Sequence, residues 1–265
     1  MLHLPKTGST FARDVIKRIY GWEKPGLKDQ LLIKFGVKEP VVLELLLRNV
    51  KVKHRNRRDQ HGIYDQIPEK YRSSGREIVS IIRDPFTAYI SRYNFGSWKK
   101  HSSQKKVQIL KKMYPHYPDI SFKEFVNSSG VSQDYRLQGI KLKENVHLGV
   151  LSLQFLQMFT RNHRELISKI DKGFRQDDNV MSFFPEITFL KNENLNLDLS
   201  NFLIKQGFTG EETKFIFDSE KKNVSTDNPF RSYLSDDIVE TIIEKEWLLF
   251  DLFPEYLPQN TPLFR

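Results

Sequence analysis

The sequence predicts an α/β fold of three layers, with a central, mainly parallel sheet flanked by helices and a helix-rich second half. Three short apolar runs support this fold class, because each leads through a few residues into a helical pattern: residues 2–4, 78–82 and 185–190. The run at 78–82 is almost entirely β-branched, which suits a strand buried on both faces of a parallel sheet. Because no repeat, low-complexity tract or linker interrupts the chain, we expect a single domain over residues 1–265.

The composition excludes some chemistries and favours polyanionic partners. The chain of 265 residues has no cysteine, which excludes disulfides and thiolate catalysis, and its seven histidines show no metal-ligand spacing, so we expect no metal. The net charge of +9 favours nucleic acid, acidic membranes, or sulfated or phosphorylated ligands, without choosing among them. No apolar run reaches the roughly 18 residues of a membrane span and no leader pattern is visible, so we expect a cytoplasmic protein whose native N-terminus can be longer.

The first apolar run enters a loop, residues 5–10, with the sequence Pro-Lys-Thr-Gly-Ser-Thr. A helical pattern follows, with apolar residues at Phe11, Val15, Ile16, Ile19 and Tyr20. The first N–H groups of a helix have no partner inside it, and the helix dipole favours negative charge there. Gly8 lets the backbone approach a ligand and Lys6 adds a positive charge. Ser9 and Thr10 can cap the helix or bond an anion. The loop is therefore either an anion site or the start of an ordinary capped helix.

The run at 78–82 leads directly into Arg83-Asp84-Pro85. Asp84 is expected to cap the next helix, and Pro85 fits its first turn. Arg83 then lies at the carboxyl end of a strand, where open α/β sheets bind ligands, and its planar guanidinium suits a phosphate. Ser91 follows about two turns into the helix. The alternative is an Arg–Asp pair at a strand end with Ser91 on the helix surface.

Together the two junctions resemble those of sulfotransferases that use 3′-phosphoadenosine 5′-phosphosulfate (PAPS). The loop at 5–10 is similar to the 5′-phosphosulfate loop of carbohydrate sulfotransferases, and Arg-Asp-Pro with a serine further along the helix is similar to the family's 3′-phosphate motif. Their order and separation also resemble the family. The resemblance is to the carbohydrate or Golgi-type group, in a bacterial member. It implies a P-loop-like fold and transfer of the sulfuryl group of PAPS to a hydroxyl-bearing acceptor, of the carbohydrate or small-molecule kind, without a nucleic-acid partner.

The resemblance also implies the residues of the PAPS site: Lys6, Thr7, Gly8, Ser9 and Thr10 around the 5′-phosphosulfate, and Arg83 and Ser91 at the 3′-phosphate. Lys6 would contact the oxygen that bridges the phosphate and the sulfuryl group. It is therefore expected both to bind the donor and to act in catalysis.

A histidine is the implied catalytic base. His61-Gly62 resembles the His-Gly pair of uronyl 2-O-sulfotransferases, in which the histidine accepts the acceptor's proton. Those enzymes carry a second histidine at the position that Ile63 occupies here. Other branches of the family use a glutamate between the two loops, so Glu39 and Glu44 remain alternatives.

Each of two basic segments has two possible interpretations. In residues 51–58 five of eight residues are Lys or Arg, and they form either a solvated loop or a basic lip that steers an anionic ligand. Residues 221–225 are either a surface loop or the counterpart of a late basic loop that family members place over the nucleotide.

The remaining pattern predicts mostly helices. We expect a surface helix across 99–113, a short helix at 121–126, a buried helix at 148–159, a helix at 194–203, and a last helix that Ser235, Asp236 and Asp237 cap and Pro254 ends. Residues 173–179 are predicted to be a polar loop. The apolar run at 41–47 fits a strand or a helix.

Two other functions compete with the transferase. A P-loop-like small-molecule kinase would need a lysine after the last glycine of the loop, whereas Lys6 precedes Gly8. A non-catalytic binder of nucleotides or polyanions would explain the positive charge without any chemistry.

Overall fold

A computed structural model describes residues 1–23, 26–38, 47–48, 58–59, 61–75, 77–100, 104–129, 139–218, 230–261 and 264. The chain divides into two compact units. The first contains Met1–Gly62, Gln66–Ile82 and Thr188–Val224, and the second contains Ile63–Asp65, Arg83–Ile187 and Ser225–Arg265. Each unit has a hydrophobic cluster of its own. The single domain expected over residues 1–265 stays a prediction.

The first unit is built on a parallel pair of strands. Strand β3 (Val79–Ile82) pairs with β4 (Thr188–Lys191) in the register Val79↔Thr188 to Ile82↔Lys191. All four residues of β3 are buried, which confirms the strand predicted at 78–82, and β4 confirms the strand predicted at 185–190 with a shift toward the C-terminus.

The first apolar run lies against β3 without forming a strand. The N–H of Leu2 donates to the carbonyl oxygen of Val79 at 2.9 Å, and the Ser80 hydroxyl donates to the carbonyl oxygen of Leu2 at 3.0 Å. The two bonds fix the chain start beside the buried strand, so the loop that follows leaves from a defined position.

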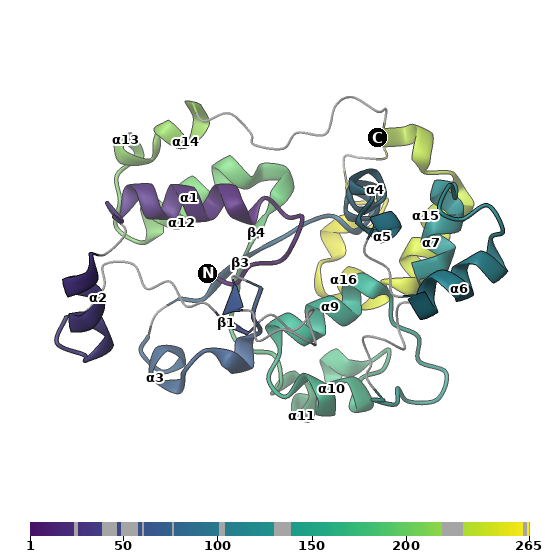
Figure 1. Ribbon diagram of the computed structural model, residues 1–265, viewed down its shortest axis with the longest axis horizontal. Coiled ribbons are helices and arrows are strands. Elements are labelled where there is room, and N and C mark those ends of the chain that lie inside the picture. Colours follow the sequence, from purple (N-terminus) through teal and green to yellow (C-terminus); the bar gives the residue numbers. More distant parts are fainter. Residues whose placement is uncertain are drawn as a thin grey trace. The chain divides into compact units, whose positions relative to one another are not determined.

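Two helices share a hydrophobic cluster with this sheet. Helix α1 (Ser9–Ile19) and helix α12 (Leu195–Lys205) confirm the helices predicted after residue 10 and at 194–203. Figure 1 shows α1 lying along α12. The buried members of the cluster are Ala12, Val15, Val79, Ile81, Leu190, Leu195, Leu199, Leu203 and Ile216. The apolar face read from the sequence of α1 is therefore the face that packs on the strands.

The other elements of the first unit are short. They are α2 (Leu27–Lys34), β1 (Leu47–Arg48), β2 (Arg58–Asp59), α3 (Glu69–Arg72), η4 (Asn192–Asn194), α13 (Gly210–Thr213) and α14 (Phe215–Asp218). Strands β1 and β2 pair antiparallel. Among the described residues the parallel sheet has two strands, so the central multi-stranded sheet and the three-layer arrangement stay predictions.

The second unit is helical in its described parts. Its elements are η1 (Tyr64–Gln66, whose last residue belongs to the first unit), α4 (Pro85–Phe95), α5 (Ser97–Lys100), α6 (Gln104–Met113), α7 (Phe122–Ser128), α9 (Val150–Phe159), α10 (His163–Lys169), η3 (Phe174–Gln176), α11 (Asp178–Met181), η5 (Phe230–Tyr233), α15 (Asp236–Lys245), α16 (Trp247–Leu252) and η6 (Pro254–Tyr256). Nine of the ten residues of α9 are buried, which confirms the buried helix predicted at 148–159. The predicted polar loop at 173–179 is wrong, because it contains η3 and the start of α11.

The predicted side-chain cap is present at the start of α4 but absent at the start of α15. Asp84 accepts from the N–H of Thr87 at 2.9 Å and Pro85 occupies the first position of α4, as predicted. Ser235 does not cap α15 through its side chain, because its hydroxyl donates to the Asp237 carboxylate instead.

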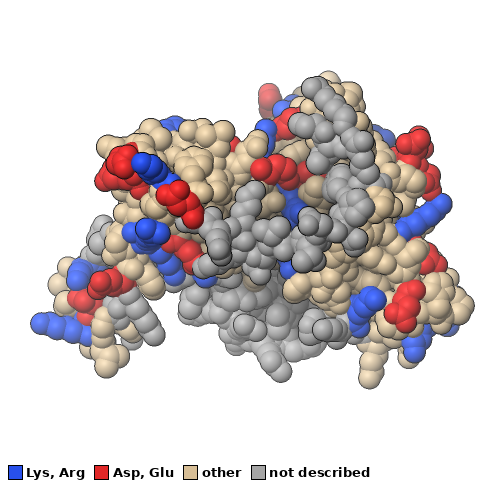
Figure 2. All heavy atoms as spheres, turned by 90° about the horizontal axis from the view of Figure 1, so that it is seen from above, with Lys and Arg blue, Asp and Glu red and all other residues tan. Residues whose placement is uncertain are grey.

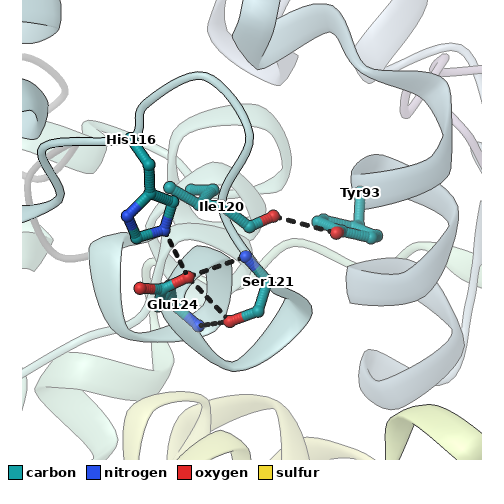
Figure 3. Close-up of polar contacts among 5 residues, drawn as sticks. All are labelled: Tyr93, His116, Ile120, Ser121 and Glu124. Atoms are coloured by element: carbon teal, nitrogen blue, oxygen red, sulfur yellow. Dashed lines mark hydrogen bonds and ion pairs between the residues drawn. The ribbon is translucent and has the colours of Figure 1, made fainter.

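Helix α7 confirms the short helix predicted at 121–126 and begins with a capping box (Figure 3). Glu124 accepts from the N–H of Ser121 at 2.7 Å, and the Ser121 hydroxyl accepts from the N–H of Glu124 at 3.3 Å. His116 lies 3.2 Å from the same carboxylate, and the Tyr93 hydroxyl donates to the carbonyl oxygen of Ile120 at 2.9 Å. The bonds from Ser121 are the main reason why the pKa of Glu124 lies below its usual value.

The last predicted helix is two helices. We expected one helix from Ser235 to Pro254, but α15 ends at Lys245 and α16 begins at Trp247. Between them Glu246 leaves helical geometry, with φ −105° and ψ 24°, and its side chain is fully buried.

The buried carboxylate of Glu246 accepts hydrogen bonds at the start of α9. The Tyr89 hydroxyl donates to it at 2.7 Å, and the backbone N–H groups of Leu151 and Ser152 donate at 3.1 and 2.7 Å. These N–H groups belong to the first turn of α9, where a helix has no partner of its own. Glu246 therefore caps α9 from elsewhere in the chain, because Gly149 at the N-cap position has no side chain to do so.

We predict that Gly149→Ala destabilises the protein strongly. A Cβ at this position would lie 2.1 Å from the Glu246 carboxyl carbon, so the carboxylate would have to move and leave buried donors unpaired. We expect a loss of about 3 kcal/mol or more in the free energy of unfolding, measured by urea titration. Gly26→Ala is the matched control, since Gly26 is also an N-cap glycine with extended backbone but has no atom within 4 Å of its Cβ position. It should cost about 0.5 to 1 kcal/mol, and equal losses would contradict the packing argument.

Candidate functional site

The loop before α1 alternates between buried and exposed residues. Lys6 and Gly8 both have left-handed backbone, with φ of 71° and 77°. Thr7 and Ser9 are buried, whereas Lys6, Gly8 and Thr10 are exposed. A non-glycine residue with positive φ is uncommon, so the surroundings hold Lys6 in this conformation. The loop thus presents its lysine and glycine to solvent and turns two hydroxyl side chains inward.

The two buried hydroxyls bond to one backbone oxygen. Thr7 Oγ1 donates to the carbonyl oxygen of Leu4 at 2.8 Å, and Ser9 Oγ donates to the same oxygen at 3.0 Å. A hydroxyl has a single proton, so in this conformation neither side chain can also donate to a bound anion. The roles that the resemblance implies for Thr7 and Ser9 therefore reduce to their backbone N–H groups.

The helix start is capped by no side chain. The N-cap residue of α1 is Gly8, and the structure shows no side-chain hydrogen bond to the cap. The prediction that Ser9 or Thr10 caps the helix is wrong, because both already lie inside its first turn. That first turn contains no acidic residue, so no carboxylate of α1 opposes the positive end of the helix dipole. Such a terminus attracts an anion.

Asn192, at the carboxyl end of β4, holds the loop from the other side. Its Nδ2 donates to the carbonyl oxygen of Thr7 at 3.0 Å. A Cβ on Gly8 would lie 2.8 Å from this Nδ2 and 2.8 Å from Cδ2 of Leu195. Glycine is thus required at position 8 for its positive φ and for this close approach.

We predict that Gly8→Ala weakens folding more than Gly21→Ala does. Both glycines have positive φ, 77° and 58°, but no atom lies within 4 Å of a Cβ built on Gly21. The shared backbone strain should cost about 1 kcal/mol in each variant, and Gly8→Ala should cost about 1 kcal/mol more because Asn192 must release Thr7. Urea unfolding of both variants measures the difference. An equal loss would mean that Asn192 does not constrain the loop.

His61 is held by a backbone oxygen next to the loop. Its Nδ1 lies 3.2 Å from the carbonyl oxygen of His3. A carbonyl oxygen only accepts, so Nδ1 must carry the proton and Nε2 of the neutral ring carries the lone pair. Gly62 brings the chain close to β1, since a Cβ there would lie 2.0 Å from Cβ of Leu47. This arrangement suits a proton acceptor at Nε2 of His61.

A second histidine, His3, lies beside His61 and belongs to no motif in the sequence. His3 is 4% exposed, and its ring centroid lies 5.7 Å from that of His61 in an edge-to-face contact. Its Nδ1 lies 2.8 Å from Ser9 Oγ. Because the Ser9 hydroxyl donates to Leu4, Nδ1 of His3 is the donor in this pair. The only signal in the sequence was its place three residues before Lys6.

Burial keeps His3 neutral. Loss of solvation is the largest of the causes that lower the pKa of His3 to about 4, and electrostatic interactions with His61 and Arg13 also contribute. At neutral pH the ring is therefore uncharged, and a proton would have to enter a buried site. No described residue bonds to Nε2 of His3.

We predict that His3 makes the protein less stable in mild acid. The folded pKa lies below the unfolded value, so as the pH falls from 6.5 to 4 the unfolded chain takes up the proton first. The free energy of unfolding should fall by about 3 kcal/mol over this range through His3 alone. Urea titrations of wild type and His3→Asn across this range isolate the contribution. Parallel pH profiles would show that His3 is not buried in its neutral form.

The second unit contains Arg83 and Ser91, the residues predicted to bind the 3′-phosphate of PAPS. Arg83 Nε donates to Thr87 Oγ1 at 3.0 Å, so the guanidinium group reaches back to the first turn of α4. Ser91 lies one turn beyond Thr87 on the same face of that helix. Arg83 thus contacts the face of α4 on which Ser91 lies one turn further along.

The structure therefore groups the predicted site residues into two sets. Lys6, Thr7, Gly8, Ser9, Thr10 and His61 belong to the first unit, and Arg83 and Ser91 belong to the second. The alternative bases Glu39 and Glu44 lie outside the described residues, as do residues 221–225 and most of 51–58.

Neither one-signed charge on the face that Figure 2 draws nor a cluster of metal ligands marks a further site among the described residues. On the face drawn in Figure 2, basic and acidic side chains of the described residues are interspersed rather than gathered into one patch of a single sign. In the part of the chain that the structure describes, no group of three or more His, Asp or Glu side chains could hold a metal ion. Within the same ranges no helix is long and apolar enough to cross a membrane.

Comparison of the chain with protein-family models, with curated proteins and with solved structures found no match. Its function is therefore inferred from its own residues and their geometry.

Proposed function

We propose that this protein transfers the sulfuryl group of PAPS to a hydroxyl group of an acceptor. The observation that carries the proposal is the loop Lys6–Thr10, in which an exposed lysine precedes an uncapped helix start, with a histidine of defined tautomer on the neighbouring backbone. The order of its residues matches the phosphosulfate loop that the sequence resembles.

The donor would be held at its two charged ends. Backbone N–H groups at the start of α1 would bind the 5′-phosphosulfate, with Lys6 at the oxygen that bridges phosphorus and sulfur. Thr10 is exposed and its hydroxyl can add a hydrogen bond. Arg83 and Ser91 would hold the 3′-phosphate, for which the bidentate guanidinium is suited.

The transfer would be an in-line displacement. The acceptor oxygen forms a bond to sulfur while the bond from sulfur to the bridging oxygen breaks, and 3′-phosphoadenosine 5′-phosphate (PAP) leaves with the electron pair. Nε2 of His61 takes the acceptor's proton, and Lys6 stabilises the negative charge that develops on the leaving phosphate. Little covalent work falls to the protein, so orientation and charge stabilisation should supply most of the rate.

We predict separable effects for three substitutions, measured with radiolabelled PAPS and a panel of hydroxyl acceptors that includes carbohydrates. Lys6→Ala should abolish detectable turnover. Arg83→Ala should do so mainly by raising KM for PAPS. His61→Ala should keep PAP affinity but reduce kcat by roughly 10²- to 10⁴-fold. Unchanged kcat in His61→Ala would move the base to Glu39 or Glu44, and wild-type turnover in Lys6→Ala would refute the proposed loop chemistry.

A non-catalytic polyanion binder is the alternative that this experiment must exclude. The charge of +9 favours such a role, and it requires no 3′-phosphate recognition. Thermal unfolding with PAP or with AMP separates the two, because only PAP has both phosphates. A transferase should be stabilised more by PAP than by AMP at equal concentration, whereas equal, salt-sensitive shifts would favour the binder.

A further inference from the structure

We propose that His3 is a positioning residue of this site, which holds His61 in its Nδ1–H tautomer and ties it to the first turn of α1. The catalytic consequence rests on the proposed sulfuryl transfer, but the geometric claim does not.

The backbone carbonyl oxygen of His3 accepts from Nδ1 of His61 and belongs to a segment that is hydrogen-bonded on both sides. Before it, Leu2 donates to Val79 and accepts from Ser80, at 2.9 and 3.0 Å. After it, the carbonyl oxygen of Leu4 accepts the hydroxyl protons of Thr7 and Ser9. The carbonyl group of His3 lies between these anchored residues but can still rotate, so its orientation also depends on the contacts of its own side chain. Those contacts therefore help to hold the oxygen that accepts from Nδ1 of His61.

The side chain of His3 links the same segment to the helix. Its Nδ1 donates to Ser9 Oγ at 2.8 Å, and Ser9 is the first residue of α1. The ring also packs edge to face on His61, with 5.7 Å between the ring centroids. One residue thus contacts the proposed base through its backbone oxygen and its ring, and contacts the anion-binding turn through its side-chain nitrogen.

The consequence for the reaction is a fixed lone pair. In the neutral ring of His61, with Nδ1 donating to the carbonyl oxygen of His3, Nε2 carries the lone pair that can accept a proton from a hydroxyl group. An unconstrained imidazole prefers the opposite tautomer, with the proton on Nε2, and in that form Nε2 cannot accept the proton of the acceptor. Loss of the His3 contacts should therefore lower kcat in proportion to the fraction of His61 that changes tautomer.

Imidazole nitrogen NMR of the full chain at neutral pH tests the proposal without any assay of activity. The His61 signals, identified by their loss in His61→Gln, should show the Nδ1–H tautomer in the wild type. His3→Asn places an amide N–H near the position of Nδ1 and should keep this tautomer. His3→Gln, which has no donor at that position, and His3→Leu should both shift His61 toward the Nε2–H form.

Ser9→Ala keeps His3 but removes the partner of its side chain, and it decides the question if His3→Leu does not fold. It should shift His61 in the same direction. Ser235→Ala is the matched control, because Ser235 lies at the start of a helix and its hydroxyl bonds to a side chain, that of Asp237, yet the substitution should leave His61 unchanged.

Kinetics complete the test. His3→Leu should lower kcat for transfer by roughly five- to tenfold with KM for PAPS nearly constant, and His3→Asn should restore most of the rate. An Nε2–H tautomer of His61 in the wild type, an unchanged tautomer in both His3→Leu and Ser9→Ala, or no rescue by Asn would overturn the proposal. If the tautomers shift as expected but the wild type transfers no sulfuryl group, the positioning role stands and the proposed function fails.

Discussion

The carbonyl oxygen of Leu4 is the point on which the candidate site depends. It accepts the hydroxyl protons of Thr7 and Ser9 and so folds the loop back on the segment that lies along β3. Because both hydroxyl groups turn inward, Lys6 and Thr10 remain outside and the first turn of α1 is left without a side-chain cap. The uncapped helix start, at which we propose an anion site, therefore results from the way the buried hydroxyl groups are satisfied elsewhere.

Gly8 and Gly149 each occupy the N-cap position of a helix, but glycine is needed there for different reasons. Gly8 is needed for its left-handed backbone and for the close approach of Asn192, which secures the loop. Gly149 has ordinary extended backbone, but the Glu246 carboxylate occupies the space that a Cβ would need. In the first case the helix start stays uncapped, and in the second a buried carboxylate caps it. The start of α1 can therefore receive an anion, whereas the start of α9 is already occupied by the Glu246 carboxylate.

The sequence was sufficient for elements that local patterns determine. The β-branched run at 78–82, the Asp84-Pro85 helix start and the uniformly apolar stretch at 148–159 each have one favoured structure, and each was confirmed. It was insufficient where a distant partner decides. No local pattern indicates that Glu246 interrupts the last helix to reach α9. Ser9 has near partners in the sequence, His3 and Leu4, but whether it bonds to them or caps α1 depends on how the segment before it lies along β3. His3 was overlooked for the same reason, because its partner His61 is distant in sequence. The prediction of a larger central sheet came from the fold class, because no further segment has a pattern that specifies a strand.

The central claim is that backbone N–H groups at the start of α1 hold the 5′ end of the donor nucleotide. The most direct measurement is a titration of the backbone amide NMR signals of Ser9, Thr10 and Phe11 with PAP and with adenosine 3′-phosphate, which lacks the 5′-phosphate. We expect these amide signals to move with PAP and to stay in place with adenosine 3′-phosphate, because only the 5′ group reaches the helix start. If they are unaffected by PAP, or move equally with both nucleotides, the loop does not bind the 5′ group.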